Sequence, residues 1–201
     1  YHGCIPMNSD GTFTEVTLFG ETVSGKSLMD KAEQLARDGY FAKNGSEEKE
    51  YGKDFLWFLW CGCYSPVYGE IKDEYYHLIE KPSVCNKILC EFGIDPNNFS
   101  HIINGHVPVK IKKGESPIKS NGKLLVIDGG LSKAYQKVTG LAGYTLLFNS
   151  HGLLLSAHDA FESIESAIKE EKDIHSTLDV VELAPNRLLV EDTDAGKALS
   201  K

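Results

Sequence analysis

Two short apolar runs in this chain end in a histidine or an aspartate beside glycine, and these residues are its best candidates for chemistry. Residues 102–106 read Ile-Ile-Asn-Gly-His, and residues 124–130 read Leu-Leu-Val-Ile-Asp-Gly-Gly. Buried strands deliver functional side chains to a sheet edge in this way, because glycine permits a sharp exit and leaves room for a ligand. His106 is either a metal ligand or an ordinary hydrogen-bonded histidine, and the pattern alone leaves both interpretations open.

Asp128 and a nearby group of lysines extend this candidate site. Asp128 either accepts a hydrogen bond that orients a metal-bound histidine or caps a helix predicted to begin near Ser132. Lys110, Lys112 and Lys113 lie between the two strand ends in sequence. They form either a solvated basic loop or a contact for a substrate phosphate, and we retain both interpretations.

A mixed α/β fold has to position these residues. Apolar positions at helical spacing from Ser27 to Arg37 predict an amphipathic helix that ends at Gly39, whereas residues 44–50 are expected to be a polar loop. The aromatic stretch from Asp54 to Pro66 is interpreted mainly as core packing, since Trp and Phe bury large apolar areas. The remaining expected elements are helices at 75–77, 83–91, 132–138 and 161–171 and strands at 13–19, 144–149, 153–157, 178–182 and 188–190. Residues 2–6 are expected to be the end of a strand that breaks into a loop, because Pro6 cannot continue the ladder.

Composition places limits on function and location. The 201 residues are 41% hydrophobic, enough for one large domain, and the net charge of −8 argues against nucleic acid as a partner. No apolar run approaches the roughly 20 residues that span a bilayer, so we expect no membrane association. Five cysteines without framework spacing suit a reducing compartment, and we expect a cytoplasmic protein. A soft domain boundary is expected near Phe161, which separates residues 1–160 from a C-terminal α/β extension at 161–201 whose polar end, residues 191–201, frays.

Several segments resemble one enzyme family. His-Gly-Cys-Ile-Pro at residues 2–6 and Asn-Gly-His-Val-Pro at 104–108 resemble the two late histidine motifs of calcineurin-like metallophosphoesterases. The aromatic run at residues 55–64 and the long segment at 101–146, which contains GHVPVKIKKGESP and LLVIDGGLSKAYQKVTGLAGYTL, look like class III fructose-1,6-bisphosphatase. The GDxxDRG motif and the GNHE or GNHD motif, which supply other metal ligands in that superfamily, are absent from these residues.

The resemblance implies a fold, an activity and a cofactor. It implies the C-terminal part of a β-sandwich flanked by helices, with the N-terminal half missing, and His2 and His106 as ligands of a dinuclear manganese centre. The full-length protein would hydrolyse fructose 1,6-bisphosphate to fructose 6-phosphate and phosphate in gluconeogenesis, while this fragment alone would be inactive. The alternatives are another calcineurin-like phosphatase, acting on proteins or dinucleotide polyphosphates, and a noncatalytic regulatory or assembly domain. A homo-oligomer is possible, since strand edges left open by a missing half favour self-association.

Overall fold

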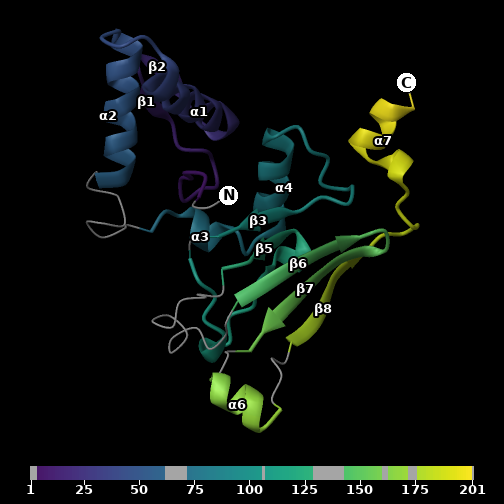
Figure 1. Ribbon diagram of the computed structural model, residues 1–201. Coiled ribbons are helices and arrows are strands. Elements are labelled where there is room, and N and C mark those ends of the chain that lie inside the picture. The colour runs from purple at the N-terminus through teal and green to yellow at the C-terminus, as the bar shows by residue number, and fades with distance from the viewer. Residues whose placement is uncertain are drawn as a thin grey trace. The chain divides into compact units, whose positions relative to one another are not determined.

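The computed structural model describes residues 4–61, 72–105, 107–128, 143–159, 163–171 and 176–200. Contacts divide the chain into an N-terminal unit, Cys4–Ile94, and a C-terminal unit, Asp95–Lys201. Helices and strands occur in both units (Figure 1), which confirms the predicted mixed α/β fold class. The sandwich implied by the resemblance and the boundary near Phe161 stay predictions, and Phe161 itself lies outside the described residues.

The N-terminal unit begins with a β-hairpin that leads into a pair of helices. Strands β1 (Val16–Leu18) and β2 (Glu21–Val23) pair antiparallel through a turn in which Phe19 and Gly20 both have positive φ, 48° and 78°. The expected strand at residues 13–19 is therefore shorter, and Phe13 makes only an isolated bridge to Met7. The main-chain N–H of Phe19 donates to the Tyr51 hydroxyl at 2.8 Å, which holds the hairpin turn against the second helix.

Helices α1 (Gly25–Phe41) and α2 (Glu47–Cys61) form this pair. Helix α1 confirms the predicted amphipathic helix and buries Leu28 and Leu35. Its start is stabilised by Ser27, whose hydroxyl accepts from the Ser24 N–H at 3.1 Å. The predicted loop at residues 44–50 is wrong from Glu47 onward, because these glutamates form the first turn of α2, where the helix dipole favours acidic side chains.

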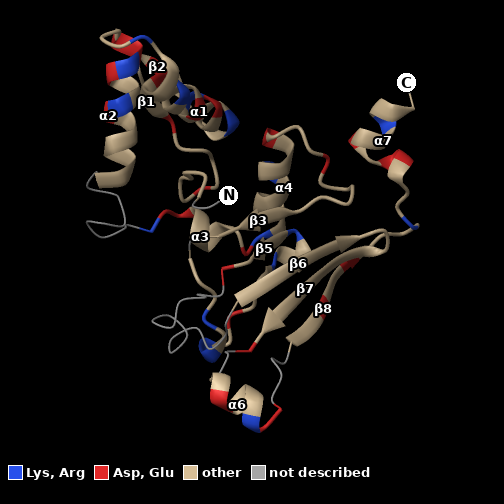
Figure 2. Cartoon of the chain, in the orientation of Figure 1, with Lys and Arg blue, Asp and Glu red and all other residues tan. Residues whose placement is uncertain are grey.

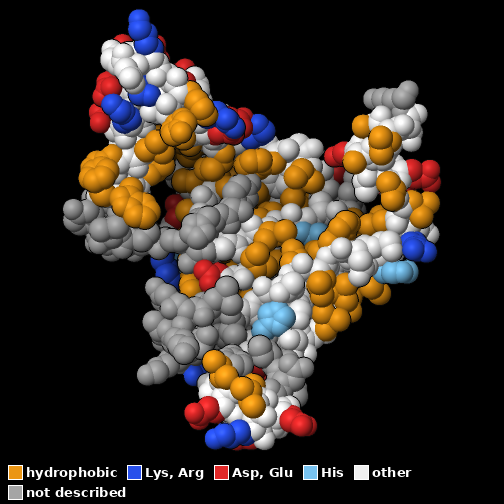
Figure 3. Space-filling view, viewed as in Figure 1, with side chains coloured by type: hydrophobic (Ala, Val, Ile, Leu, Met, Phe, Trp, Pro, Cys, Tyr) orange, Lys and Arg blue, Asp and Glu red, His pale blue; other side chains and the backbone are white. Residues whose placement is uncertain are grey.

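The aromatic stretch is not core packing in this structure, and that interpretation is wrong for its described part. Trp57 and Trp60 are 69% and 71% exposed, although Phe55 is half-buried. Charged residues occupy the first half of α2 (Figure 2), and apolar side chains gather at its other end (Figure 3). The core of this unit comes instead from short helices further along the chain.

Helices α3 (Tyr75–Leu78) and α4 (Pro82–Glu91) supply much of that core. Helix α4 confirms the predicted helix at 83–91 and begins with proline, whose missing N–H would have no helical partner at that position. Asp73 joins α3 to the start of the chain, because its Oδ1 accepts from the N–H groups of Met7 and Tyr75 at 3.0 and 2.8 Å. The buried apolar side chains of the unit are Ile5, Met7, Leu28, Leu35, Tyr75, Leu78, Ile79, Val84, Cys85, Ile88 and Leu89.

The C-terminal unit contains two three-stranded sheets. In the first, β5 (Leu124–Val126) lies between β3 (Ile102–Asn104), which is parallel to it, and β4 (Ile118–Lys119), which is antiparallel. All three β5 residues are buried, as a central strand covered on both faces requires. Short 3₁₀ turns at Ile111–Lys113 and Ser120–Gly122 lie on either side of β4 in sequence.

The second sheet is an antiparallel meander of β6 (Gly143–Asn149), β7 (Gly152–His158) and β8 (Ser176–Leu183), with β7 central (Figure 1). These strands confirm the expected strands at 144–149, 153–157 and 178–182. Helix α6 (Ile164–Lys169) is shorter than the helix expected at 161–171, because Ser163 caps its start and Glu170 its end, and residues 161–162 lie outside the described residues. The helix expected at 132–138 also lies outside the described residues.

The end of the chain differs from the prediction. Residues 188–190 are not a strand, since Leu188 makes one main-chain hydrogen bond to Ser150, at 2.7 Å, and no ladder. A 3₁₀ turn (Val190–Asp192) and helix α7 (Asp194–Leu199) follow where fraying was expected. The hydroxyl of Thr193 caps α7 by accepting from the Gly196 N–H at 3.0 Å. No helix in the described part of the chain is long and apolar enough to cross a membrane.

Candidate functional site

The two strand ends singled out in the sequence lie side by side. Because β3 and β5 are parallel, with Asn104 opposite Val126, their carboxyl ends meet at one edge of the sheet. The Ile127 N–H donates to the Asn104 carbonyl at 2.9 Å, so the contact continues one residue beyond β5. Asn104 is only 2% exposed. The two runs are thus strands that end at a sheet edge, as predicted, and the structure adds that their ends lie together.

The chain then returns to the same edge after residue 106. The N–H of Val109, which is 3% exposed, donates to the Asp128 carbonyl at 2.9 Å. Residues on both sides of position 106 are thus held to adjacent residues of the strand exit, Asn104 to Ile127 and Val109 to Asp128. His106 itself lies outside the described residues, as does His2, so their roles as metal ligands stay predictions.

Asp128 is half-buried where β5 leaves the sheet. Its main-chain carbonyl is the group that accepts from Val109. The two interpretations of its side chain, orienting a histidine ligand or capping a helix near Ser132, both involve residues outside the described part and stay predictions.

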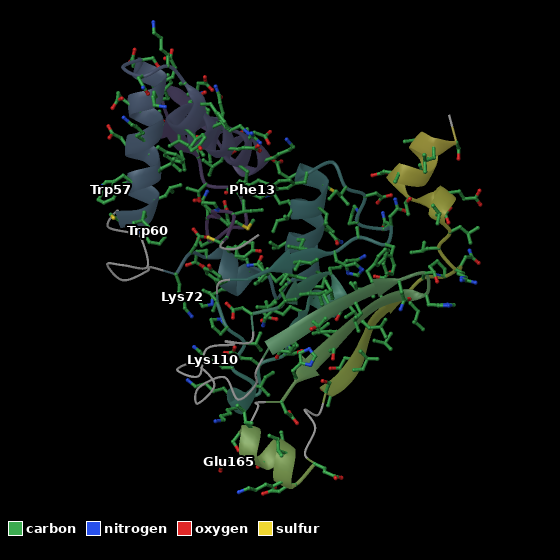
Figure 4. All side chains as sticks on the ribbon, viewed as in Figure 1. Phe13, Trp57, Trp60, Lys72, Lys110 and Glu165 are labelled. Atoms are coloured by element: carbon green, nitrogen blue, oxygen red, sulfur yellow. The ribbon has the colours of Figure 1, made fainter. Side chains whose placement is uncertain are left out.

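The lysines occupy the segment that leads away from this edge. Lys110 directly follows Val109 and is half-buried, and Figure 4 labels it. Lys112 and Lys113 are exposed on the 3₁₀ turn. The main-chain N–H of Lys110 donates to the Glu115 carboxylate at 2.9 Å, which closes the turn and places a negative charge in the same segment. Of the three, Lys110 lies nearest the strand exit along the chain, and its role in binding phosphate stays a prediction.

Sequence reasoning did not single out His101, which is buried immediately before β3. Its Nδ1 lies 2.8 Å from the Gly122 carbonyl and therefore carries a proton that it donates there. Its Nε2 faces the Glu182 carboxylate on β8 at 3.4 Å, a contact that attracts only when the imidazole is protonated. This pair links the first sheet to the second. The apolar run that follows His101 could have drawn attention to this histidine, because it places His101 at the start of a strand. Nothing in the sequence near Glu182 indicated that this residue would face His101.

A second histidine is fully occupied by neighbours. The two ring nitrogens of His158 lie 2.7 Å from the Thr145 and Ser176 hydroxyls, which are its neighbours across the antiparallel sheet. No carboxylate takes part in these two hydrogen bonds, and both nitrogens are engaged, so the arrangement supports strand pairing. Within the described ranges, no group of three or more His, Cys, Asp or Glu side chains is arranged to hold a metal ion. These residues therefore do not supply a complete metal site by themselves.

Comparison with known proteins identifies the family. The model of the Firmicute fructose-1,6-bisphosphatase family matches residues 1–201. The chain belongs to this family. A protein named fructose-1,6-bisphosphatase class 3 from Clostridium novyi (strain NT) is 51% identical over 220 aligned positions, which include all of this chain and 33% of that protein. The class 3 protein of Clostridium botulinum (strain Alaska E43 / Type E3) is 52% identical over 218 positions.

Membership of this family confirms the resemblance seen in the sequence, and it also shows how much of the family's length is present. The chain spans about a third of the length of the curated relatives that it matches. No solved structure matches the chain. The parallel β3–β5 edge therefore belongs to a chain of the fructose-1,6-bisphosphatase family. About two thirds of each relative lies outside the region that matches this chain.

Proposed function

We propose that this chain is the C-terminal part of a protein that hydrolyses fructose 1,6-bisphosphate to fructose 6-phosphate and phosphate, a step of gluconeogenesis. The observation that carries this proposal is the family match over all 201 residues, together with 51% identity to a class 3 fructose-1,6-bisphosphatase. The substrate is a small, highly charged sugar phosphate, which suits a cytoplasmic enzyme. Because the relatives' remaining residues are not in this chain, the activity is proposed for the full-length protein.

We further propose that His106 and His2 contribute to a dinuclear manganese site, within a calcineurin-like sandwich completed by the rest of the protein. Two manganese ions held there would lower the pKa of a coordinated water and would neutralise charge on the phosphoryl oxygens. The support for His106 is its position between two residues whose main chains are held at the β3–β5 edge. A ligand side chain needs neighbours that are held in place, and Asn104 and Val109 are held in this way. The remaining donors would come from residues outside the described part.

For Asp128 and the three lysines, the proposed roles rest on where these residues lie relative to the β3–β5 edge. Asp128 leaves β5 at the same edge and would orient the His106 imidazole. Lys110, Lys112 and Lys113 would place ammonium groups beside the second phosphate of the sugar, with Lys110 nearest the edge. Each would act by charge and hydrogen bonding, since a lysine is a point charge that suits a mobile phosphate group.

The decisive experiment measures phosphate release from fructose 1,6-bisphosphate by the full-length protein with manganese present, before and after replacing His106 with Ala. We expect the His106→Ala variant to lose about 100-fold or more in turnover, the scale on which loss of a ligand or of its support disturbs a metal site. His151→Ala is the matched control, because His151 is exposed in the β6–β7 turn and only its main chain takes part in a hydrogen bond there. We expect this control to keep wild-type turnover.

Near-wild-type turnover of His106→Ala at saturating manganese would exclude His106 as a ligand. The 201 residues assayed alone should release no appreciable phosphate, because His2 and His106 are the two ligands that we assign to them and the remaining donors are expected from the rest of the protein. Turnover by the chain alone that matched the full-length enzyme would place the active site elsewhere in these residues.

A further inference from the structure

The last turns of α2 form a surface that is apolar all the way round. Leu56, Trp57, Phe58, Leu59 and Trp60, here called the aromatic end of α2, are 40%, 69%, 52%, 53% and 71% exposed. About 3.6 residues complete one helical turn, so five consecutive apolar residues face every direction around the axis. A helix of that character belongs inside a larger core, since amphipathic surface helices keep one side polar.

The partner helix does not cover this end. Helix α2 meets α1 through Gly52, which is the buried residue of α2, and the main chains come close at Gly39 and Gly52. The aromatic end begins four residues further along the chain, and Figure 4 shows Trp57 on the side of α2 away from α1. Charged side chains lie on the first half of the helix and are absent from residues 55–61 (Figure 2). The exposed apolar side chains are contiguous in Figure 3, as in surfaces that bind a partner.

We propose that the aromatic end of α2 is a docking surface for the part of the polypeptide that the curated relatives have and this chain lacks. That part amounts to about two thirds of each relative, and its complementary surface would be an apolar groove that encloses the helix end. The proposal rests on family membership and not on the bisphosphatase activity. It assigns an assembly role to α2: the exposed end of this helix would dock on the portion of the protein that is expected to complete the sandwich.

Two other occupants fit the geometry less well. A two-fold contact with a second copy would cover one side of the helix and leave the opposite side in water, whereas both sides carry large apolar groups. A membrane is a poor partner because residues 55–61 extend only about 10 Å as a helix, against a hydrocarbon core of about 30 Å. A groove in the rest of the same polypeptide would enclose the helix end on all sides. Each helix end would then have one groove available to it.

The first test is hydroxyl-radical footprinting read by mass spectrometry, comparing the 201-residue chain with the full-length protein. Trp57 and Trp60 are the only two tryptophans of this chain, and both lie on the proposed surface. We expect their oxidation rates to fall by about fivefold or more in the full-length protein, as side chains that are about 70% exposed become buried. Oxidation of Tyr40 and Phe41, which are 76% and 73% exposed in the 201-residue chain, serves as the dose reference there.

Three footprinting results would overturn the proposal. Equal, rapid oxidation of both tryptophans in the two proteins would show that nothing docks there. Protection in the 201-residue chain that disappears on dilution would identify a second copy as the occupant. Protection in that chain that is independent of concentration would mean that the chain covers the surface itself.

The second test uses matched substitutions in both proteins. Trp60→Asp should leave the thermal midpoint of the 201-residue chain unchanged, because the side chain is exposed there, and should lower the midpoint of the full-length protein by several degrees. Tyr40→Asp alters an equally exposed side chain of the same helical pair and should change neither midpoint by more than about a degree, as expected of a surface substitution. Equal effects of Trp60→Asp in the two proteins would contradict the proposal, whether or not the enzyme is active.

Discussion

Replacing Gly52 with Ala tests how closely α1 and α2 approach each other. A Cβ built on Gly52 would lie 2.4 Å from the Gly39 nitrogen, 2.5 Å from the Leu35 carbonyl oxygen and 2.7 Å from the Gly39 Cα. Ordinary carbon contacts begin near 3.4 Å, so the facing main chain would have to move by about 1 Å. All three facing atoms belong to the main chain of α1, which cannot shift without moving the whole helix.

The magnitude follows from two opposing effects. Alanine is favoured over glycine inside a helix by about 1 kcal/mol, and Gly52 has no positive φ that would oppose the change. Overpacking a tight contact costs about 1–3 kcal/mol, and three main-chain contacts below 3 Å place this site at the upper limit. We therefore expect Gly52→Ala to lower the free energy of unfolding by about 2 kcal/mol, opposite in sign to its helix propensity.

The assay is urea unfolding of the 201-residue chain followed by tryptophan fluorescence. Both tryptophans lie on α2, so this signal reports the affected helix directly. With a urea dependence of about 2 kcal/mol per molar, the midpoint should fall by about 1 M. Lys53→Ala is the matched control one residue away, where loss of an exposed ion pair with Glu50 should cost less than about 0.5 kcal/mol. An unchanged or raised midpoint for Gly52→Ala would refute the close contact between the helices.

Substitutions at two further positions, Asp73 and Tyr144, test single polar groups. Asp73→Ala should lower the free energy of unfolding by about 1–3 kcal/mol in the same urea assay, because the Met7 and Tyr75 N–H groups lose their shared acceptor, and Asp73→Asn should restore at least half of the loss. Tyr144→Phe should raise stability by about 1 kcal/mol, because the buried Tyr144 hydroxyl has no hydrogen-bond partner in the described structure, and a loss above 1 kcal/mol would reveal a missed partner. Burial, with a smaller effect of the Asp179 charge, raises the pKa of Tyr144 to about 12 from 10.0. The unfolded chain therefore ionises first, and the wild type should lose stability between pH 10 and 12 in a step that Tyr144→Phe lacks.

Local sequence patterns predicted the elements whose burial follows their own periodicity. Helix α1 shows apolar residues at helical spacing, and the β6–β7 hairpin joins two apolar runs across a two-residue turn, so both were found close to their observed bounds. The two apolar runs at residues 102–106 and 124–130 were also recognised as strands that end at a polar residue beside glycine. Their parallel pairing, which brings the two ends to one edge, was seen only in the structure.

The wrong predictions at residues 188–190 and 47–50 both depended on residues outside the short window that was read. Residues 188–190 look like a strand, but Leu188 makes a single main-chain bond to Ser150 and Val190 is 75% exposed. The glutamates at the start of α2 look like a solvated loop, because their helix depends on the residues that follow. Sheet pairing requires a partner strand with a free edge, and composition within a short window carries no information about one.

The sequence by itself determined the family, the mixed α/β class and the two apolar runs that form β3 and β5, because each depends on motifs or periodicities contained in a few neighbouring residues. Their parallel pairing at one edge depended on the tertiary structure. Tertiary structure alone decided that Gly39 and Gly52 bring two helices together, that His101 faces Glu182 and that the aromatic end of α2 is exposed. Burial is a property of a residue's surroundings and not of its type. Two tryptophans that were expected to pack in the core therefore lie on the surface of this chain.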